Sequence, residues 1–251
     1  MKNYNKIKKE LIKKIIDISY KNKEGHIGSS LSIIDILYII YSIKNQEDQF
    51  VLSKGHASLG LYVVLEYFNL LHDDLNNFCK FDSKLGGHPY SYPNSSITCA
   101  TGSLGHGFPF AAGLAMAKKI KESPGKVYCL IGDGESNEGT IWETAMLASH
   151  HKLNNLFCIM DHNHSGDRAL NIDDIVKKFQ SFGWYCQWVD GHDPQKIINS
   201  LSVVTESKPC FILANTIKGY GIQRMHNNPE WHHKSPNESQ YQEILNEINN
   251  I

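Results

Sequence analysis

The sequence lacks the charge excess, the long apolar runs and the paired cysteines that mark several classes of protein. Its 25 Lys and Arg residues nearly balance 26 Asp and Glu residues, for a net charge of −1. This balance argues against nucleic-acid binding, which needs a basic surface. No apolar run is long enough to cross a bilayer, and none of the six cysteines forms a CxxC pair for zinc or redox chemistry. We therefore expect neither a nucleic-acid partner nor a membrane.

The start of the chain also lacks the features of a targeting segment. Residues 1–19 mix lysine with isoleucine and leucine at helical spacing, without the continuous apolar stretch and small-residue cleavage site of a secretory signal. We predict a cytoplasmic location. The length allows one large core, and no low-complexity linker divides it, so we predict a single domain over residues 1–251.

Short buried apolar runs alternate with helical patterns along most of the chain. This rhythm is typical of a three-layer α/β fold, with a mainly parallel sheet and helices on both faces. The predicted strands cover 50–53, 127–131, 156–160, 184–189 and 210–216. The predicted helices cover 6–22, 32–41, 57–69, 110–121, 138–151, 172–182 and 194–205. We expect loops at 25–30 and 82–109, and a loop-rich tail after Gly219.

Polar side chains follow two of the predicted strands directly. Gly132-Asp133-Gly134 ends one strand, and Asp161-His162-Asn163 ends the next. In open α/β sheets, ligands bind beyond the carboxyl ends of the strands, and glycines allow a close approach of the backbone to a diphosphate. A carboxylate and an amide oxygen, together with phosphate oxygens, suit Mg²⁺. Asp133 and Asn163 are therefore candidate metal ligands.

The pattern Gly132-Asp133-Gly134…Asn163 resembles the signature of enzymes that use thiamine diphosphate. Four loops place the chain more narrowly, because they follow the order found in transketolases. These loops are Gly25-His26-Ile27-Gly28, Ser53-Lys54-Gly55-His56-Ala57, Gly87-His88-Pro89 and Thr101-Gly102-Ser103-Leu104-Gly105-His106-Gly107. The later stretches 132–139, 216–221 and 228–232 extend the resemblance, which covers residues 20–235.

The resemblance implies that this chain binds thiamine diphosphate with Mg²⁺ or another divalent cation. Gly132 and Gly134 belong to the cofactor site, and the side chains of Asp133 and Asn163 bind the metal. The third metal ligand is the backbone carbonyl two residues beyond the asparagine. Transketolases usually carry isoleucine there and this chain has Ser165, a change that a backbone ligand tolerates.

The resemblance also gives roles to four histidines. His26 and His88 face the sugar, His56 contacts the diphosphate, and His232 lies near both. Imidazoles suit this work because they titrate near neutrality and both donate and accept hydrogen bonds. We predict His26, His88 and His232 as catalytic. Four other histidines match no required position and are interpreted as structural: His106, His150, His151 and His164.

Further cofactor-binding residues follow from the same resemblance. Gly102, Ser103 and Leu104 form the turn that approaches the pyrimidine and thiazolium rings of the cofactor. Glu138 lies at a subunit contact. Its alternative role is that of an acidic residue that favours the helix dipole.

Single-chain transketolases continue into a pyrimidine-binding domain, whereas this sequence ends at Ile251. We therefore expect this chain to work with a separately encoded C-terminal subunit, in a dimer of heterodimers that transfers a two-carbon ketol unit from a ketose to an aldose. Two enzymatic alternatives remain: the α-type subunit of a 2-oxo-acid dehydrogenase, and a relative of deoxyxylulose-phosphate synthase. A third alternative is a non-catalytic module that binds thiamine diphosphate.

Overall fold

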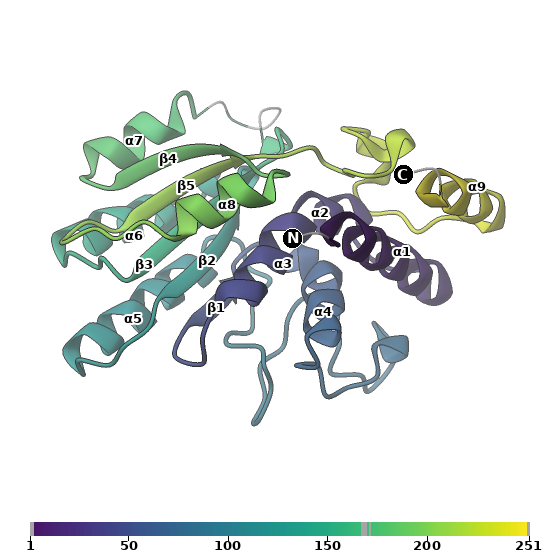
Figure 1. Ribbon diagram of the computed structural model, residues 1–251, viewed down its shortest axis with the longest axis horizontal. Coiled ribbons are helices and arrows are strands. Elements are labelled where there is room, and N and C mark those ends of the chain that lie inside the picture. Colours follow the sequence, from purple (N-terminus) through teal and green to yellow (C-terminus); the bar gives the residue numbers. More distant parts are fainter. Residues whose placement is uncertain (1–2, 167–169, 171, 250–251) are drawn as a thin grey trace.

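A computed structural model describes residues 3–166, 170 and 172–249, which fold around a five-stranded parallel sheet (Figure 1). The strands are β1 (Gln49–Leu52), β2 (Val127–Gly132), β3 (Leu156–His162), β4 (Tyr185–Asp190) and β5 (Cys210–Asn215). Their order across the sheet is β1-β2-β3-β5-β4, and every neighbouring pair is parallel. The predicted fold class is confirmed.

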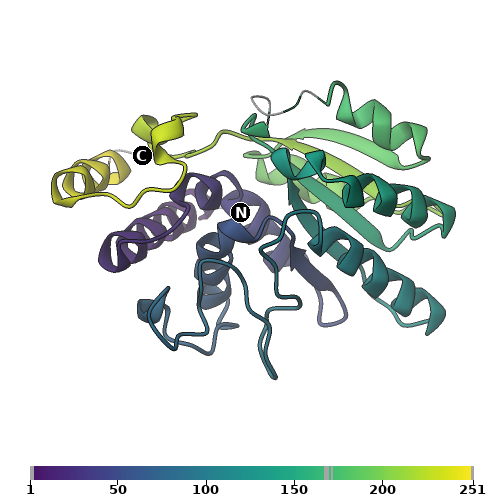
Figure 2. The ribbon, with the colours of Figure 1, turned by 180° about the vertical axis from the view of Figure 1, so that it is seen from behind.

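Helices cover both faces of the sheet (Figures 1 and 2). One face carries α5 (Gly107–Ile120), α6 (Gly139–His150) and α7 (Ile175–Ser181). The other face carries α3 (Ile34–Ile43) and α8 (Pro194–Leu201). Beside the sheet lie α1 (Tyr4–Asn22), α2 (Ile27–Ser32), α4 (Ser58–Tyr67) and α9 (Glu238–Asn249).

Both faces of the sheet are buried because successive side chains of a strand point to opposite sides. In β2, Tyr128 and Leu130 join the cluster on the α3 and α8 side, whereas Cys129 and Ile131 join the cluster on the α5 to α7 side. The same alternation runs along β3 and β5. The continuous apolar runs in the sequence therefore correspond to strands packed on both faces.

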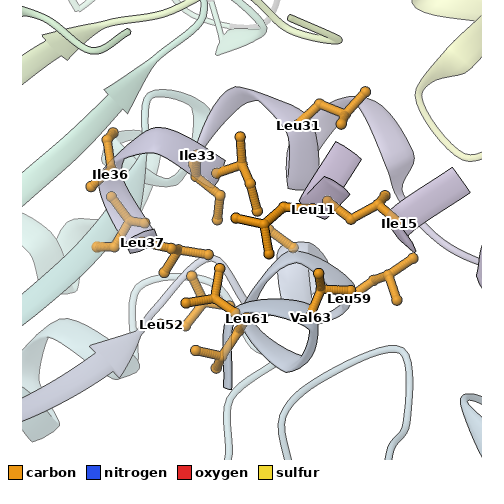
Figure 3. Close-up of a cluster of buried hydrophobic side chains, with 14 of the residues drawn as sticks. Leu11, Ile15, Leu31, Ile33, Ile36, Leu37, Leu52, Leu59, Leu61 and Val63 are labelled. Atoms are coloured by element: carbon orange, nitrogen blue, oxygen red, sulfur yellow. The ribbon is translucent and has the colours of Figure 1, made fainter. Parts of the chain in front are cut away.

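The helices beside the sheet share one apolar core with it (Figure 3). Leu11 and Ile15 of α1 face Leu59 of α4, and Leu37 of α3 lies next to Leu52 of β1. All five side chains are at most 3% exposed. This shared core fixes the helices that carry the first histidine loop against the strands that carry the metal-ligand candidates.

Two parts of the sequence prediction are wrong. The segment 25–30, predicted as a loop, contains the start of α2, and the tail contains α9. The six residues of α2 are all buried, so its small polar side chains gave no apolar stripe. Its backbone packs closely on α4, where a Cβ at Gly60 would lie 3.1 Å from the Ser30 carbonyl oxygen.

The missed helix α9 packs on α1 through few side chains. Only Ile244 and Ile248 of α9 are buried, which is a short apolar stripe in a polar stretch. Tyr241 stacks on Tyr20 with ring centroids 4.1 Å apart, and its hydroxyl donates to Asp17 over 2.8 Å. Contacts with α1, at the other end of the chain, therefore support the helix. Within the described residues, no helix is both long and apolar enough to cross a membrane.

We expect Phe179→Ala to lower the free energy of unfolding by about 3–5 kcal/mol, because Phe179 is fully buried and stacks on Phe211 with centroids 3.9 Å apart. Urea denaturation followed by circular dichroism measures this loss. Phe81 is 95% exposed, so Phe81→Ala should change the free energy by less than about 0.5 kcal/mol. Equal losses in the two variants would contradict the core assignment.

Candidate active site

The carboxyl ends of four neighbouring strands meet at one edge of the sheet. Lys54 follows β1, Asp133 follows β2, Asn163 follows β3 and Thr216 follows β5. Gly132 and Asp161 are partners in the β2–β3 register, so the polar residues after both strands emerge side by side. Parallel register therefore gathers residues from across the sequence at one edge, as predicted for Asp133 and Asn163.

A buried carboxylate, Asp161, organises this edge. Its Oδ2 accepts hydrogen bonds from Ser32 Oγ (2.8 Å) and Asn163 Nδ2 (2.8 Å), and it pairs with Lys54 Nζ. Its Oδ1 accepts from Thr216 Oγ1. Burial alone would raise the pKa of Asp161, but the charge of Lys54 and these hydrogen bonds hold the pKa below its ordinary value. Asp161 is therefore an anion that orients Asn163.

The orientation of Asn163 leaves its amide oxygen free to face a cation. Its Nδ2 is turned inward to Asp161, and its Oδ1 accepts one hydrogen bond, from the Ser165 backbone N–H over 3.1 Å. Asn163 itself is 4% exposed. The side-chain oxygen keeps a second lone pair for a ligand.

Asp133 provides a second oxygen at the same edge. Its Oδ1 accepts from the Gly134 N–H over 2.7 Å, whereas its Oδ2 is buried and has no hydrogen-bond partner in the described structure. A buried carboxylate oxygen without a partner is costly unless a cation or a donor occupies the space beside it. The donor set of Asp133 and Asn163 therefore fits a hard divalent cation.

Ser165 follows Asn163 in an exposed position, with its Oγ 3.1 Å from Lys218 Nζ. The described residues contain no group of three or more His, Cys, Asp or Glu side chains that could hold a metal by themselves. A cation at this edge would therefore take one carboxylate, one amide oxygen and backbone or ligand oxygens, which is the predicted set.

A second buried carboxylate, Glu135, joins the predicted cofactor turn to the sheet. Its carboxylate accepts from Ser53 Oγ, from the Gly105 N–H over 2.8 Å and from the Gly132 N–H over 3.1 Å. Burial raises the pKa of Glu135 despite these donors. Gly105 has a φ of +82°, and a Cβ there would lie 2.7 Å from the Glu138 Cβ, so this turn requires glycine.

The turn at 102–104 lies against two predicted site residues. A Cβ at Gly102 would be 3.4 Å from the ring of His88, and a Cβ at Gly55, next to His56, would be 3.1 Å from the Gly102 backbone nitrogen. Ser103 is exposed and Leu104 is half-buried. Glu138 is exposed at the start of α6, on the outer side of this turn.

Three predicted histidines gather around one ring. The centroid of His26 lies 5.4 Å from that of His56 and 5.6 Å from that of His232. His233, which was not predicted, is nearer still, at 4.4 Å from His26. His88 is on the long loop, and its charge contributes to the electrostatics of His26. The structure therefore brings residues 26, 56 and 232 together, with His88 at the margin.

These imidazoles are held in the neutral state. Burial, followed by the charge of Lys54, lowers the pKa of His56 to about 2. Burial, followed by the charge of His233, lowers the pKa of His26 to about 4. Burial and Lys218 also lower the pKa of His232. A neutral imidazole donates from one nitrogen and accepts at the other, so these rings can bind hydroxyl and carbonyl groups.

A cavity of about 450 Å³ opens beside the metal-ligand candidates. Its walls include Asn163, His164, Ser165, Lys218, Pro229 and His232. Lys218 is 7% exposed, and its Nζ lies 2.6 Å from His232 Nδ1. Burial, with the nearby charge of Lys54, lowers the pKa of Lys218 to about 8, so the side chain is still mostly protonated at neutral pH. The cavity suits an anionic group next to a cation.

Sequence reasoning missed several residues of this site. Lys54, Asp161 and Lys218 carry its charges, and His164, interpreted as structural, lines the cavity. One signal was available: Lys54 and Asp161 each stand directly at the end of an apolar strand, where an unpaired charge would be costly. Opposite charges at two strand ends of one sheet indicate a buried pair.

Comparison with known proteins gives a consistent result. The family model "Transketolase, thiamine diphosphate binding domain" matches residues 6–246. One of the named subunits of the apulose-4-phosphate transketolase of Phocaeicola vulgatus is 34% identical, over 94% of this chain and 90% of its own length. The 6-deoxy-6-sulfo-D-fructose transketolase subunit SqwG of a Clostridium species is 37% identical, over 78% of each chain.

Solved structures agree with the sequence comparisons. The transketolase of Campylobacter jejuni superposes with a TM-score of 0.86 and 29% identity, over 96% of this chain. The match covers 42% of that longer protein, so the chain spans about two fifths of the solved transketolase.

We expect the free energy of unfolding of the cofactor-free chain to fall as the pH drops from 7.5 to 5.5. Since the pKa of His56 is about 2 in the fold and about 6.5 in the unfolded chain, only the unfolded chain takes up this proton below pH 6.5. Between pH 6.5 and 5.5 the loss from His56 is about 1 kcal/mol. Urea denaturation across this range should show a flatter dependence for His56→Gln, and an unchanged one for His72→Gln, since His72 is exposed. Equal pH dependence in all three proteins would contradict the neutral state of His56.

Proposed function

Because this chain belongs to the transketolase family, we propose that it is the thiamine-diphosphate-binding subunit of a two-chain transketolase. The complex would transfer a two-carbon ketol unit from a ketose to an aldose. The observation that carries the proposal is the buried, unpartnered Asp133 Oδ2 beside the inward-turned amide of Asn163. This arrangement supports a cation that anchors a diphosphate.

We propose Mg²⁺ or another divalent cation at this position. Asp133, Asn163 and the Ser165 carbonyl would hold the metal, with the glycines at 132 and 134 close to the diphosphate. His56, His232 and the Gly102–Leu104 turn would contact the cofactor. The ammonium group of Lys218 supports this placement because it brings a positive charge to the same cavity.

When bound, thiamine diphosphate supplies the carbon that takes up the two-carbon unit. We propose that His26, His88 and His232 bind the hydroxyl and carbonyl groups of the sugars and move protons at those oxygens. The lowered pKa values of His26 and His232 support this role, because a neutral ring can accept a proton at one nitrogen and donate from the other.

We propose that the partner is a separately encoded C-terminal subunit with the pyrimidine-binding domain, in a dimer of heterodimers in the cytoplasm. Two relatives carry "subunit" in their names, which supports a two-chain enzyme. On this chain, α5 and α6 expose Phe110, Met146 and Leu147, which are 43%, 50% and 59% exposed. Glu138 is exposed at the start of α6. These apolar side chains favour a docking face on α5 and α6, with residues 1–251 acting as one domain.

The test of function uses a tagged chain recovered from its native cells with Mg²⁺ and thiamine diphosphate. We expect a second chain in equal amount, and exchange of a two-carbon unit between ketose and aldose phosphates, measured by mass spectrometry of the sugars. Pyruvate turnover instead would favour the 2-oxo-acid dehydrogenase alternative. Full cofactor occupancy without any carbon–carbon bond chemistry would favour a binding module.

Asp133→Ala should weaken Mg²⁺-dependent binding of thiamine diphosphate by more than about 100-fold, since loss of even an outer partner of a metal site costs about 10–100-fold. Isothermal titration of the complex measures this affinity, and circular dichroism checks the fold. Glu10→Ala removes an exposed carboxylate on α1 and should leave the affinity unchanged. An unaltered affinity in Asp133→Ala would overturn the metal assignment.

Leu147→Glu should prevent assembly with the partner, because it places a charge in the apolar docking face while leaving the core intact. Native mass spectrometry of the co-expressed chains measures assembly. Trp188 on the edge strand β4 is similarly exposed, at 62%, so Trp188→Glu is the matched control and should still assemble. Normal assembly of Leu147→Glu would show that the partner docks elsewhere.

A further inference from the structure

A buried carboxylate outside the cavity, Asp35 on α3, collects three donors. Asp35 is 0% exposed, and its Oδ1 accepts from the Tyr4 hydroxyl. Its Oδ2 accepts from Lys8 Nζ over 2.8 Å and from His192 Nδ1 over 2.8 Å. His192 follows β4 and is 157 positions away in the sequence, with a side chain only 7% exposed. The network therefore ties α1 and α3 to the loop after β4.

The second ring nitrogen of His192 holds a different segment. His192 Nε2 accepts a hydrogen bond from the Ile217 backbone N–H over 2.9 Å. A ring nitrogen that accepts a hydrogen bond carries no proton, so the proton is on Nδ1, which donates to Asp35. Tyr220 stacks on the same ring, with centroids 3.5 Å apart and an interplanar angle of 11°. Both nitrogens and one face of the imidazole are therefore occupied.

The segment that His192 holds carries a cation of the cavity. Ile217 directly precedes Lys218, whose Nζ lies 2.6 Å from His232 Nδ1 and 3.1 Å from Ser165 Oγ. On the far side, the Gly219 N–H donates to the Gly28 carbonyl over 3.0 Å. The Ile217 N–H is thus the point where a side chain from outside the cavity fixes the backbone of Lys218.

We propose that Asp35 and His192 are a positioning pair that sets the place of Lys218 beside the diphosphate site. His192 acts through the Ile217 N–H and touches neither cofactor nor substrate. Its consequence for the cofactor depends on the proposed function, whereas its hold on residues 216–219 does not.

Two substitutions separate the two hydrogen bonds of His192. His192→Asn keeps a donor near the Nδ1 position for Asp35 but has no acceptor that reaches the Ile217 N–H. His192→Gln places an amide oxygen near the Nε2 position and keeps that acceptor. We expect amide hydrogen exchange in residues 216–219 to be at least about tenfold faster in the Asn variant, which has lost one backbone bond, and within about threefold of the original in the Gln variant.

The cofactor readout is a double-mutant cycle on the complex with its partner. We expect His192→Asn to raise the Kd for thiamine diphosphate, at saturating Mg²⁺, by about tenfold when Lys218 is present. In a Lys218→Met background the same change should raise the Kd by less than about twofold, because the group it positions is gone. His192→Gln should restore most of the affinity.

Equal costs of His192→Asn in both backgrounds would overturn the action through Lys218. Equal hydrogen exchange in the Asn and Gln variants would overturn the hold on Ile217 and show a general structural role. If the unsubstituted complex binds no thiamine diphosphate, the proposed function fails together with the cofactor part of this inference. The hydrogen-exchange comparison still decides, without cofactor, whether the pair positions the segment.

Discussion

The ion pair between Lys54 and Asp161 is the interaction on which the site depends. The two side chains are 1% and 0% exposed, and they join the ends of β1 and β3 across the end of β2. Gly132 allows this crossing, since a Cβ there would already be 3.7 Å from the Lys54 side chain. Removing two charges from water is costly, and the donors from Ser32, Asn163 and Thr216 offset part of that cost. The pair thus orients a metal ligand rather than merely supporting the core.

The charges of the site are arranged in two zones with different chemistry. Near the strand ends, Asp133 and Asn163 present oxygens, with the ammonium of Lys218 close by. Farther out, His26 and His56 are kept neutral by burial and by their charged neighbours. A charged group is therefore favoured in the inner zone, and polar uncharged groups in the outer one. This division matches a ligand with an anionic anchor and a second reactant rich in hydroxyl groups.

Local patterns in the sequence predicted the sheet and the metal-ligand candidates, since apolar runs and the Gly132-Asp133-Gly134 motif are contiguous. Long-range contacts produced the remainder. The helix α9 depends on stacking between Tyr241 and Tyr20, and the network of Asp35 joins residues from opposite parts of the chain. Neither contact leaves a periodic signal, because each residue is one polar or aromatic position without a repeat. Buried helix α2 was missed for the same reason, as every face of it is covered.

The exposed apolar side chains of α5 and α6 have a consequence for the supply of this protein in a cell. A surface with Phe110, Met146 and Leu147 in water is prone to non-specific association when its intended neighbour is scarce. Binding of that neighbour stabilises the folded chain by mass action, so the lifetime of each copy follows the neighbour's concentration. Matched synthesis of the two chains would then serve as quality control, and surplus copies of this one would be the first substrates for proteolysis.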